Sequence, residues 1–416
     1  MCQGVHHHHG HSHHLHPHEH EHPHAAQGHW QNHTVSNEGR SSRRDFLRVL
    51  MGGALTGASI LELAYHRAAW ARAAAAAPDS NLFDLQKAAE GVFLAQARPQ
   101  AAINCNAAVF VRSKDVVVVD AHSKPSAAAA LIAQLKREVT TKPVRYVINT
   151  HFHWDHWQGN PGYRAAGEKV DFISSKTTRQ LMVDQGPARM KASLDSVPEA
   201  IEALRKQSEK AKSAEEKAYC AEQIRRWQAY QSELKNYSPE LPTITFDDSY
   251  ELKDSAFDLH LGFHGNAHTS GDVFAFCPQQ HAIATGDACI GWIPNLGDGF
   301  PKSWPRTLDE VAKAEFNHVL GGHGPLQTGR GVMTNLRNYI EELAGRVERA
   351  KEAGTSVEEM QKQITVATLK SLDSNGYGAY LTKSMAAGIP HFGDFAPMQD
   401  LVNSNIRDVY KNLDKV

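Results

Sequence analysis

The segment NTHFHWDHWQGN (residues 149–160) places three histidines and one aspartate within six residues. In chain order these are His151, His153, Asp155 and His156, the pattern HxHxDH. Imidazole nitrogens and carboxylate oxygens suit Zn²⁺, and three protein ligands with an open position are typical of a catalytic zinc site. His151 and His153 alternate, so an extended backbone can point both the same way. The segment therefore predicts a metal site, but it cannot complete two such sites alone.

Three later residues can supply the missing ligands. They are His268 in GNAHTSGD, Asp287 in ATGDACI and His323 in GGHGP. Each is expected just past the end of a strand, where rigid scaffolds commonly carry functional side chains. Gly286, which precedes Asp287, allows close approach of the backbone. The pattern thus indicates one site assembled from four separate segments.

Taken together, these motifs resemble the metallo-β-lactamase superfamily. HxHxDH, HTxGD, TGD and GHG occur in that order, after Asp120, which follows the run VVVV. The five pieces extend from Asp120 to Pro325, about half of the chain, and are specific as a set. The resemblance implies an α/β fold, a four-layer αββα sandwich, with a binuclear metal site in a cleft at one edge of the two sheets.

The resemblance also implies a role for each motif residue. The first metal would be held by His151, His153 and His268. The second would be held by Asp155, His156 and His323, with Asp287 bridging both. Asp120 and Asp272 would support the metal loops without touching the metal. Two Zn²⁺ per chain are expected, with Fe or Mn as possible replacements.

We therefore expect an exported dinuclear zinc hydrolase, which uses a metal-bridging hydroxide to cleave an ester, thioester, lactone or lactam bond. Asp155 is expected to orient the hydroxide and shuttle its proton. Three alternatives stay open: a β-lactamase proper, a mononuclear iron sulfur dioxygenase of the same fold, and a non-catalytic periplasmic metal-binding protein. An aspartate at position 287 resembles glyoxalase II more than several β-lactamase subclasses, and the full second ligand set argues against the dioxygenase.

Aromatic residues near the motifs are candidates for a substrate wall. Trp154 and Trp157 bracket the end of HxHxDH, and Trp292 lies in GWIPNLGDGFPKSW, which has the composition of an active-site loop. His260 and His264 share an expected strand with His268 at even spacing, and we interpret both as structural.

The elements that must position these residues follow an α/β rhythm. Strands are predicted at 107–113, 115–122 and 144–150, with a helix at 124–139. The charged, alanine-rich stretch from Pro198 to Tyr237 interrupts this rhythm and predicts an inserted helical hairpin.

After the hairpin, strands are predicted at 243–254, 256–265 and 273–287, the last as a hairpin around Pro278. A helix is predicted over about 330–353. A further helix should begin after Gly354, with Thr355 and Glu358 as a capping box.

The N-terminal part of the chain is expected to be a leader. Residues 1–40 form a histidine-rich segment expected to be disordered, since 14 of the 26 histidines lie in the first 33 residues. Residues 41–77 resemble a twin-arginine export signal, with Arg43 and Arg44 before a short apolar run. An ordinary amphipathic helix after Ser42 is the alternative reading.

We place the catalytic domain at 78–353, with the insertion at about 186–237, and a helical extension at 354–416. A signal peptide implies a periplasmic or otherwise exported protein, with no stable membrane anchor after cleavage. The net charge of −2 offers no basis for nucleic-acid binding. The expected partner is a small-molecule substrate, and the oligomeric state stays open.

Overall fold

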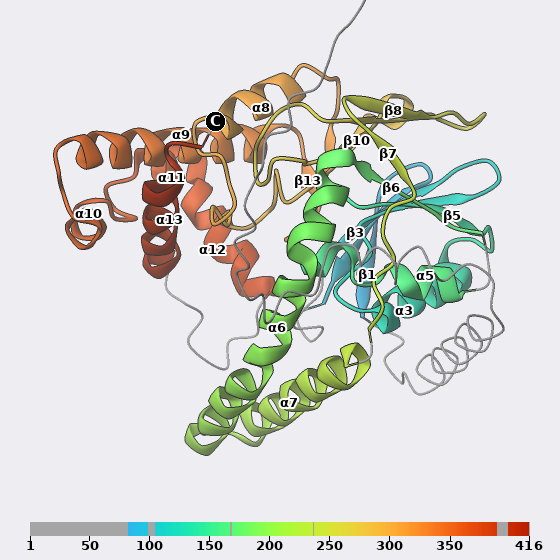
Figure 1. The fold of residues 1–416 in the computed structure, drawn as a ribbon, viewed down its shortest axis with the longest axis horizontal. Coiled ribbons are helices and arrows are strands. Elements are labelled where there is room, and N and C mark those ends of the chain that lie inside the picture. The colour runs from blue at the N-terminus through green and yellow to red at the C-terminus, as the bar shows by residue number, and fades with distance from the viewer. Residues whose placement is uncertain (1–81, 99–104, 167–168, 236, 389–397, 416) are drawn as a thin grey trace, which may run out of the picture. The chain divides into compact units, whose positions relative to one another are not determined.

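The computed structural model describes residues 82–98, 105–166, 169–235, 237–388 and 398–415 (Figure 1). The expected leader and export signal, residues 1–77, lie outside the described residues, so their predictions stay predictions. Every site residue predicted from the sequence lies within the described part.

A seven-stranded sheet forms one half of the fold. Its strands follow chain order: β1 (Phe83–Ala89), β2 (Val92–Ala97), β3 (Ala107–Val111), β4 (Val116–Val119), β5 (Val144–Ile148), β6 (Asp171–Ser175) and β7 (Ile244–Phe246). Pairing is antiparallel from β1 to β4 and parallel from β4 to β7. The parallel connection from β4 to β5 passes through α3 (Pro125–Glu138). The carboxyl ends of β4 and β5 therefore lie at the same edge.

A six-stranded sheet forms the other half. Its order is β13 (Gln327–Thr328), β12 (His318–Gly321), β11 (Ala282–Gly286), β10 (Phe274–Cys277), β9 (Leu259–Gly262) and β8 (Ser249–Leu252). Only the β11–β12 pairing is parallel among these strands. The predicted hairpin around Pro278 is present, with the short 3-10 helix η2 (Pro278–Gln280) between β10 and β11.

Three clusters of buried apolar side chains lie between the layers of the fold. One lies between the sheets and joins residues such as Val117 and Phe110 to Leu261 and Ala284. A second packs the outer face of the first sheet against α3 and α5 (Asn160–Ala165). A third packs the outer face of the second sheet against α8 (Trp304–Val311) and α9 (Gly331–Glu352). This arrangement confirms the expected αββα sandwich.

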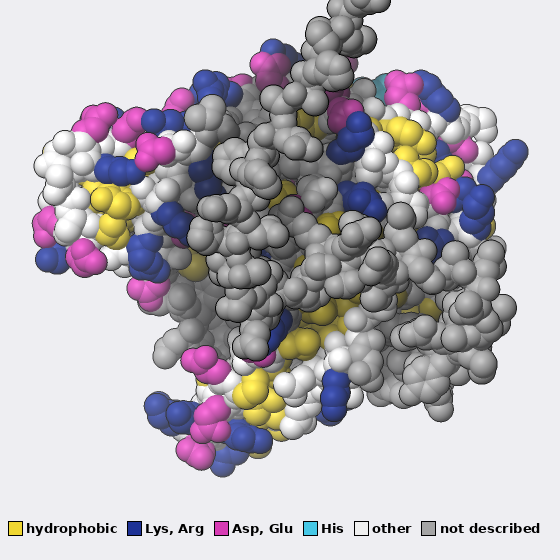
Figure 2. Space-filling view, in the orientation of Figure 1, with side chains coloured by type: hydrophobic (Ala, Val, Ile, Leu, Met, Phe, Trp, Pro, Cys, Tyr) yellow, Lys and Arg dark blue, Asp and Glu magenta, His cyan; other side chains and the backbone are white. Residues whose placement is uncertain are grey.

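The charged stretch between β6 and β7 forms two long helices, α6 (Lys176–Lys210) and α7 (Ala214–Leu234). Ser213 and Glu216 form a capping box at the start of α7. In Figure 1 the pair projects away from the sheets, and Figure 2 shows side chains of both charges at its far end. Helix α6 begins at Lys176, well before Pro198, and runs through Pro187 and Pro198. The sequence did not predict one continuous helix here, because proline usually ends a helix.

The C-terminal helices share a core with the second sheet. They are α9, α10 (Val357–Gln363), α11 (Lys370–Asp373), α12 (Tyr377–Gly388) and α13 (Met398–Asn412), with the 3-10 helix η3 (Ser374–Gly376) before α12. Met360, Leu381 and Ile406 belong to the same apolar cluster as Phe274 and Val319 of the sheet. The cap of α10 is Ser356, whose hydroxyl accepts from the Glu359 amide, so the N-cap lies one residue after the predicted Thr355.

Within the described ranges, no helix is both long and apolar enough to cross a membrane.

Candidate metal centre

The HxHxDH segment leaves the carboxyl end of β5 and turns into the four-residue helix α4 (Trp154–Trp157). Backbone bonds hold this turn against the end of β4: the Asp120 amide donates to the Ile148 carbonyl, and the Ala121 amide donates to the His156 carbonyl. The Asn149 side chain also donates to the His156 carbonyl, at 3.1 Å. The metal loop is therefore fixed to the middle of the first sheet.

Asp120 lies at the centre of this support. Its carboxylate accepts hydrogen bonds from the Thr150 amide (2.9 Å), from the Thr150 hydroxyl (2.9 and 3.0 Å to its two oxygens) and from Nδ1 of His156 (2.8 Å). The side chain is buried, and its backbone takes a φ of 68°, which is unfavourable for a residue other than glycine. Asp120 thus occupies the supporting position that the family resemblance implies.

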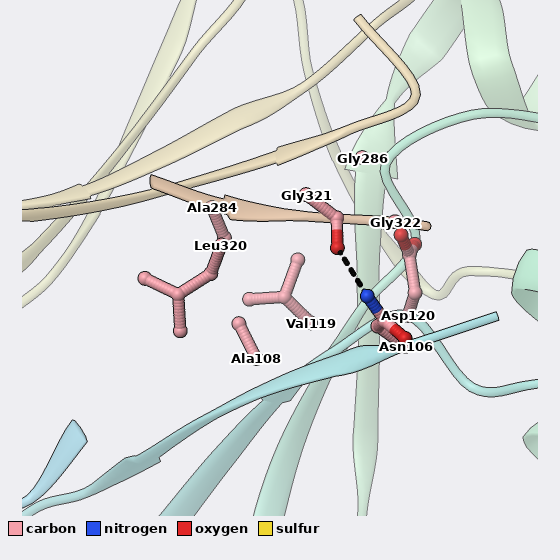
Figure 3. A pocket seen from close by; sticks show the side chains of 9 residues that line it. All are labelled: Asn106, Ala108, Val119, Asp120, Ala284, Gly286, Leu320, Gly321 and Gly322. Carbon is pink, nitrogen blue, oxygen red and sulfur yellow. Dashed lines mark hydrogen bonds between the residues drawn. The ribbon is translucent and has the colours of Figure 1, made fainter. Parts of the chain in front are cut away.

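The second sheet meets the first at this point. Figure 3 shows Asp120 and Asn106 lining a small pocket with Gly321 and Gly322, and Asn106 donates to the Gly321 carbonyl at 3.0 Å. The Gly322 amide donates to the Gly286 carbonyl at 2.8 Å. A Cβ at Gly322 would lie 2.3 Å from Oδ1 of Asp287, so this approach requires glycine.

The predicted ligands converge above this junction in three overlapping groups, within each of which the ligand atoms lie within 4.8 Å of one another. The groups are His151, His153 and His268; His151, His156 and Asp287; and Asp155, His156 and His323. All seven residues that the sequence singled out as ligands are brought together. The shared members His151 and His156 make the three groups one continuous centre.

Hydrogen bonds on the far side of the rings orient the histidines. Nδ1 of His151 lies 2.9 Å from the Thr150 hydroxyl, which itself donates to Asp120 and is therefore free to accept from this ring. Nδ1 of His156 lies 2.8 Å from the Asp120 carboxylate, an acceptor only. His151 therefore carries its proton on Nδ1 and presents an Nε2 lone pair to the centre. Burial alone would lower the pKa of His156, but neighbouring acidic groups, the Asp155, Asp287 and Asp120 carboxylates among them, raise it well above its usual value, so its Nε2 offers a lone pair only when a cation replaces the proton there.

His153 and His268 face each other directly. Nδ1 of His268 lies 3.1 Å from the Asn295 carbonyl, and Nε2 of His153 lies 2.8 Å from Oδ2 of Asp298. Both of these oxygens only accept, so each outer nitrogen carries a proton, and the inner nitrogens, Nδ1 of His153 and Nε2 of His268, lie 2.9 Å apart. Burial lowers the pKa of His268 to about 3, so its ring is neutral. Nε2 of His268 therefore carries a lone pair, which can accept a hydrogen bond from Nδ1 of His153 or bind a cation.

The carboxylates face the other side of the centre. Nε2 of His323 lies 3.1 Å from Oδ2 of Asp155 and 3.5 Å from Oδ2 of Asp287. Asp287 also lies 3.5 Å from Nε2 of His156 and 3.8 Å from Nε2 of His268, so it touches both sides. Burial alone would raise the pKa of the Asp155 and Asp287 carboxyls, but the surrounding imidazoles hold both well below their usual range.

The donor set fits divalent metal. Among the described residues, Nε2 of His151, Nε2 of His156 and Oδ1 of Asp287 are buried without a hydrogen-bond partner. Buried polar atoms are rarely left unpaired, and a group of them that converges is typical of an ion-binding site. Nitrogen and carboxylate donors in this ratio suit Zn²⁺. These residues can therefore hold metal, and Asp287 lies within reach of histidines of all three groups.

The segment around His268 differs from the prediction. Strand β9 ends at Gly262, so neither His264 nor His268 lies in it, and His268 sits in the connection to β10. Asp272 shapes that connection by accepting from the Thr269 amide (2.8 Å) and hydroxyl (2.6 Å). Burial raises the pKa of the Asp272 carboxyl to about 7. Asp272 therefore supports the turn that carries His268.

The three predicted wall residues lie in different environments. Trp292 stacks on His323, with ring centroids 5.2 Å apart and planes 21° from parallel. Trp154 is half-buried and packs on Tyr230 of α7, at 5.9 Å. Trp157 is only 3% exposed and packs against Phe152 and Met182, so it belongs to the packing beneath the site and not to an open wall.

Two charged residues at the site were not predicted. Asp298 accepts from His153, and Arg189 of α6 donates to the other oxygen of Asp298 at 2.7 Å. Asp298 lies in the segment interpreted from its composition as an active-site loop. That composition was the one feature of the sequence that could have indicated its role. Nothing in the sequence distinguishes Arg189 from the other cations of the charged helix.

Comparisons with known proteins agree with this geometry. A family model described as the metallo-beta-lactamase superfamily matches residues 102–315, just over half of the chain. The chain therefore belongs to the metallo-β-lactamase superfamily.

Two solved structures are similar to it. A metallo-beta-lactamase from Pontibacter korlensis is 15% identical, with a TM-score of 0.44, over 61% of this chain and 98% of that one. The stereoselective inverting sec-alkylsulfatase Pisa1 from Pseudomonas sp. is 15% identical, with a TM-score of 0.54, over 82% of this chain. This chain spans about half (51%) of the sulfatase, and the likeness supports the fold.

Proposed function

We propose that this protein is a metal-dependent hydrolase with two zinc ions. The observation that carries the proposal is the convergence of the three ligand groups, in which ring nitrogens of His151 and His156 and an oxygen of Asp287 are buried without a hydrogen-bond partner. His151, His153 and His268 would hold one ion, Asp155, His156 and His323 the other, and Asp287 both. Bound zinc would lower the pKa of a coordinated water towards about 7 and polarise the substrate oxygen.

Asp155 is the residue proposed to move the proton. Its carboxylate is ionised and 17% exposed, so it faces both the centre and the open side of the site. Such a group can orient the attacking water, accept its proton and return it to the leaving group. Trp292, stacked on His323, offers a flat apolar surface beside a ligand of the second group.

The cysteines do not compete for the role of nucleophile. All four cysteines in the described ranges are free and buried. Burial raises the pKa of both Cys105 and Cys289 to about 12, and the thiol rather than the thiolate is therefore present at neutral pH. Water is the nucleophile that this site supports.

The bond cleaved is proposed to be an ester, thioester, lactone or lactam, and export through the twin-arginine route is proposed from the sequence alone. β-Lactam cleavage, iron-dependent sulfur oxidation and simple metal binding are the alternatives that an assay must separate. The likeness to a sec-alkylsulfatase adds a secondary alkyl sulfate to the substrates worth testing.

The test combines metal analysis with a hydrolysis panel on the full-length, zinc-loaded protein. The panel contains an aryl ester, a lactoyl thioester, a lactone, nitrocefin and a secondary alkyl sulfate. We expect two zinc ions per chain and turnover of at least one probe. D155A should reduce kcat by about 10²–10⁴-fold, the usual contribution of a positioned acid–base group.

The matched control is D195A, which removes an exposed carboxylate of α6 that pairs with Lys191. Its activity should equal that of the wild type. One tightly bound iron with sulfur oxidation would favour the dioxygenase instead. Two bound zinc ions without hydrolysis of any probe would favour a metal-binding protein.

A further inference from the structure

One short loop orients two of the three histidines in the first metal group. The loop of residues 295–298 follows Trp292 in the chain and contacts the outer ring nitrogens of His268 and His153. Its Asn295 carbonyl accepts from Nδ1 of His268 at 3.1 Å, and its Asp298 carboxylate accepts from Nε2 of His153 at 2.8 Å. This loop therefore determines which nitrogen of each ring faces the centre.

The orienting effect of the loop can be tested most directly at His153, because its partner is a side chain that mutation can remove. With Nε2–H held by Asp298, the ring turns Nδ1 towards His268 and would offer that nitrogen to any metal between them. Partners on the outer nitrogen of a metal-binding histidine fix its tautomer and raise its basicity, and losing one typically costs about 10–100-fold in metal affinity.

The loop is in turn held from two sides. From the insertion, Arg189 of α6 donates to Oδ1 of Asp298 at 2.7 Å, and its guanidinium lies 4.7 Å from the centroid of the Phe152 ring. Phe152 is buried and sits in sequence between His151 and His153. Arg189 thus contacts the metal loop and its supporting carboxylate together.

From the other side, the C-terminal helix α13 secures the loop backbone. The fully buried Asn412 donates from Nδ2 to the carbonyls of Leu296 (2.8 Å) and Gly297 (3.0 Å). Lys415, just beyond α13, donates to the Asp298 carbonyl at 3.5 Å. Two elements outside the sandwich layers, α6 and α13, therefore meet at the loop that orients His153 and His268.

We infer that Asp298 is a positioning residue for the first metal group and that Arg189 of the helical insertion holds Asp298 in place. The inference rests on the proposed metal centre. It makes the affinity for the first metal depend on the insertion, which contributes no ligand of its own.

If the Arg189–Asp298 pair were an ordinary surface ion pair, its loss would have a different effect. The side chains of Arg189 and Asp298 are 34% and 29% exposed, and such partly exposed pairs contribute little to stability. Loss of the pair should therefore change the stability of the metal-free fold little. A positioning role predicts instead a specific loss of metal affinity.

The experiment measures zinc affinity of the full chain by competition with a chromophoric chelator, for the wild type, D298A, D298N and R189M. D298A should weaken one of the two zinc ions by about 10–100-fold and leave the other within about threefold. D298N retains an oxygen that can accept from His153, and R189M retains Asp298 itself, so both should lie between D298A and the wild type.

K191M is the matched control, because Lys191 lies on the same helix and pairs with the exposed Asp195. It should bind both zinc ions as the wild type does. A second readout is the tautomer of His153 in the zinc-free, ¹⁵N-histidine-labelled chain. Long-range ¹H–¹⁵N correlations should show a proton on Nε2 in the wild type and a mixture in D298A.

Each result separates the two proposals. A wild type that binds two zinc ions, with equal affinities and tautomers in D298A, would overturn the positioning role alone. A wild type that takes up no zinc would overturn the metal centre and, with it, the inference. If D298A does not fold, D298N and R189M decide, and wild-type affinity in both would overturn the role.

Discussion

The two halves of the centre are oriented by different parts of the molecule. In the second group, His156 is held by Asp120, a buried carboxylate at the end of β4 that also accepts from the backbone of the metal loop. In the first group, His153 is held by Asp298, which is 29% exposed and lies in a loop supported by α6 and α13. The chemistry of the two contacts is the same: a carboxylate accepts from the outer nitrogen of a histidine.

The two contacts differ in the part of the molecule that holds the carboxylate in place. Asp120 is part of the junction of the two sheets, so its removal disturbs the fold and the centre together. Breaking a buried charged contact costs about 3–5 kcal/mol, whereas an exposed pair contributes at most about 1 kcal/mol. The second group is therefore oriented by a residue of the sandwich itself, whereas the first group is oriented by elements added to the sandwich.

The largest effect is expected from G322A. The added Cβ would lie 2.3 Å from Oδ1 of Asp287 and 2.7 Å from Cε1 of His156, so it must displace a ligand of the second group. We expect loss of one zinc ion, with affinity falling by at least about 100-fold, beyond what loss of a supporting residue usually costs. Metal analysis after dialysis checks this. G331A, where nothing lies within 4 Å of the added Cβ, should retain both ions.

The second-largest effect is expected from D120N. The amide has one accepting oxygen where the carboxylate has two, so either His156 or Thr150 then faces a donor. We expect one zinc ion to weaken by about 10–100-fold and the metal-free protein to lose about 3–5 kcal/mol in urea unfolding.

The control for D120N is D171N, on β6 of the same sheet. Asp171 forms a partly exposed pair with Arg145, and its loss should cost at most about 1 kcal/mol. If D120N destabilises the fold no more than D298N does, the contrast between the two halves of the centre is wrong.

A smaller effect is expected from N412A, which releases the loop from α13. The two lost hydrogen bonds to Leu296 and Gly297, each contributing about 0.5–1.5 kcal/mol, should lower the unfolding free energy by about 1–3 kcal/mol, although the Leu296 carbonyl still accepts from the Gly299 amide. Zinc affinity should fall only a few-fold, in the first group, because Arg189 still holds Asp298. N405A offers the matched control on the same helix: Asn405 is equally buried, but donates to Tyr339 and not to the loop. Equal zinc affinities in N412A and N405A would argue against this link.

The smallest effect is a change in pH dependence. His153 and Arg189 outweigh partial burial and hold the pKa of the Asp298 carboxyl below its ordinary value. A lowered folded-state pKa adds stability above the unfolded-state pKa of about 4, and this stability is lost as the pH falls below it. The difference in unfolding free energy between wild type and D298N should therefore be constant above about pH 5 and shrink in more acidic solution. Urea unfolding of the zinc-free proteins across this range measures it, and a difference that grows on acidification would contradict the assignment.

Much of the fold was readable from the sequence because its signals are local. The apolar run VVVV, the strand before HxHxDH and the hairpin around Pro278 form strands where predicted. Failures came where packing overrode local preference. Helix α6 continues through Pro187 and Pro198, and Trp157 is buried although it borders the ligand cluster.

The sequence by itself determined the ligand types, their order and the class of site, since metal-binding motifs keep their spacing along the chain. Only the tertiary structure decided which nitrogen of each histidine faces the centre. That choice depends on partners far away in the chain: Asp120 for His156, and Asp298 for His153. A hydrogen bond between residues more than a hundred positions apart, such as the one from His153 to Asp298, leaves no periodic or local pattern. It exists because the sheets, the insertion and the C-terminal helix bring these residues together.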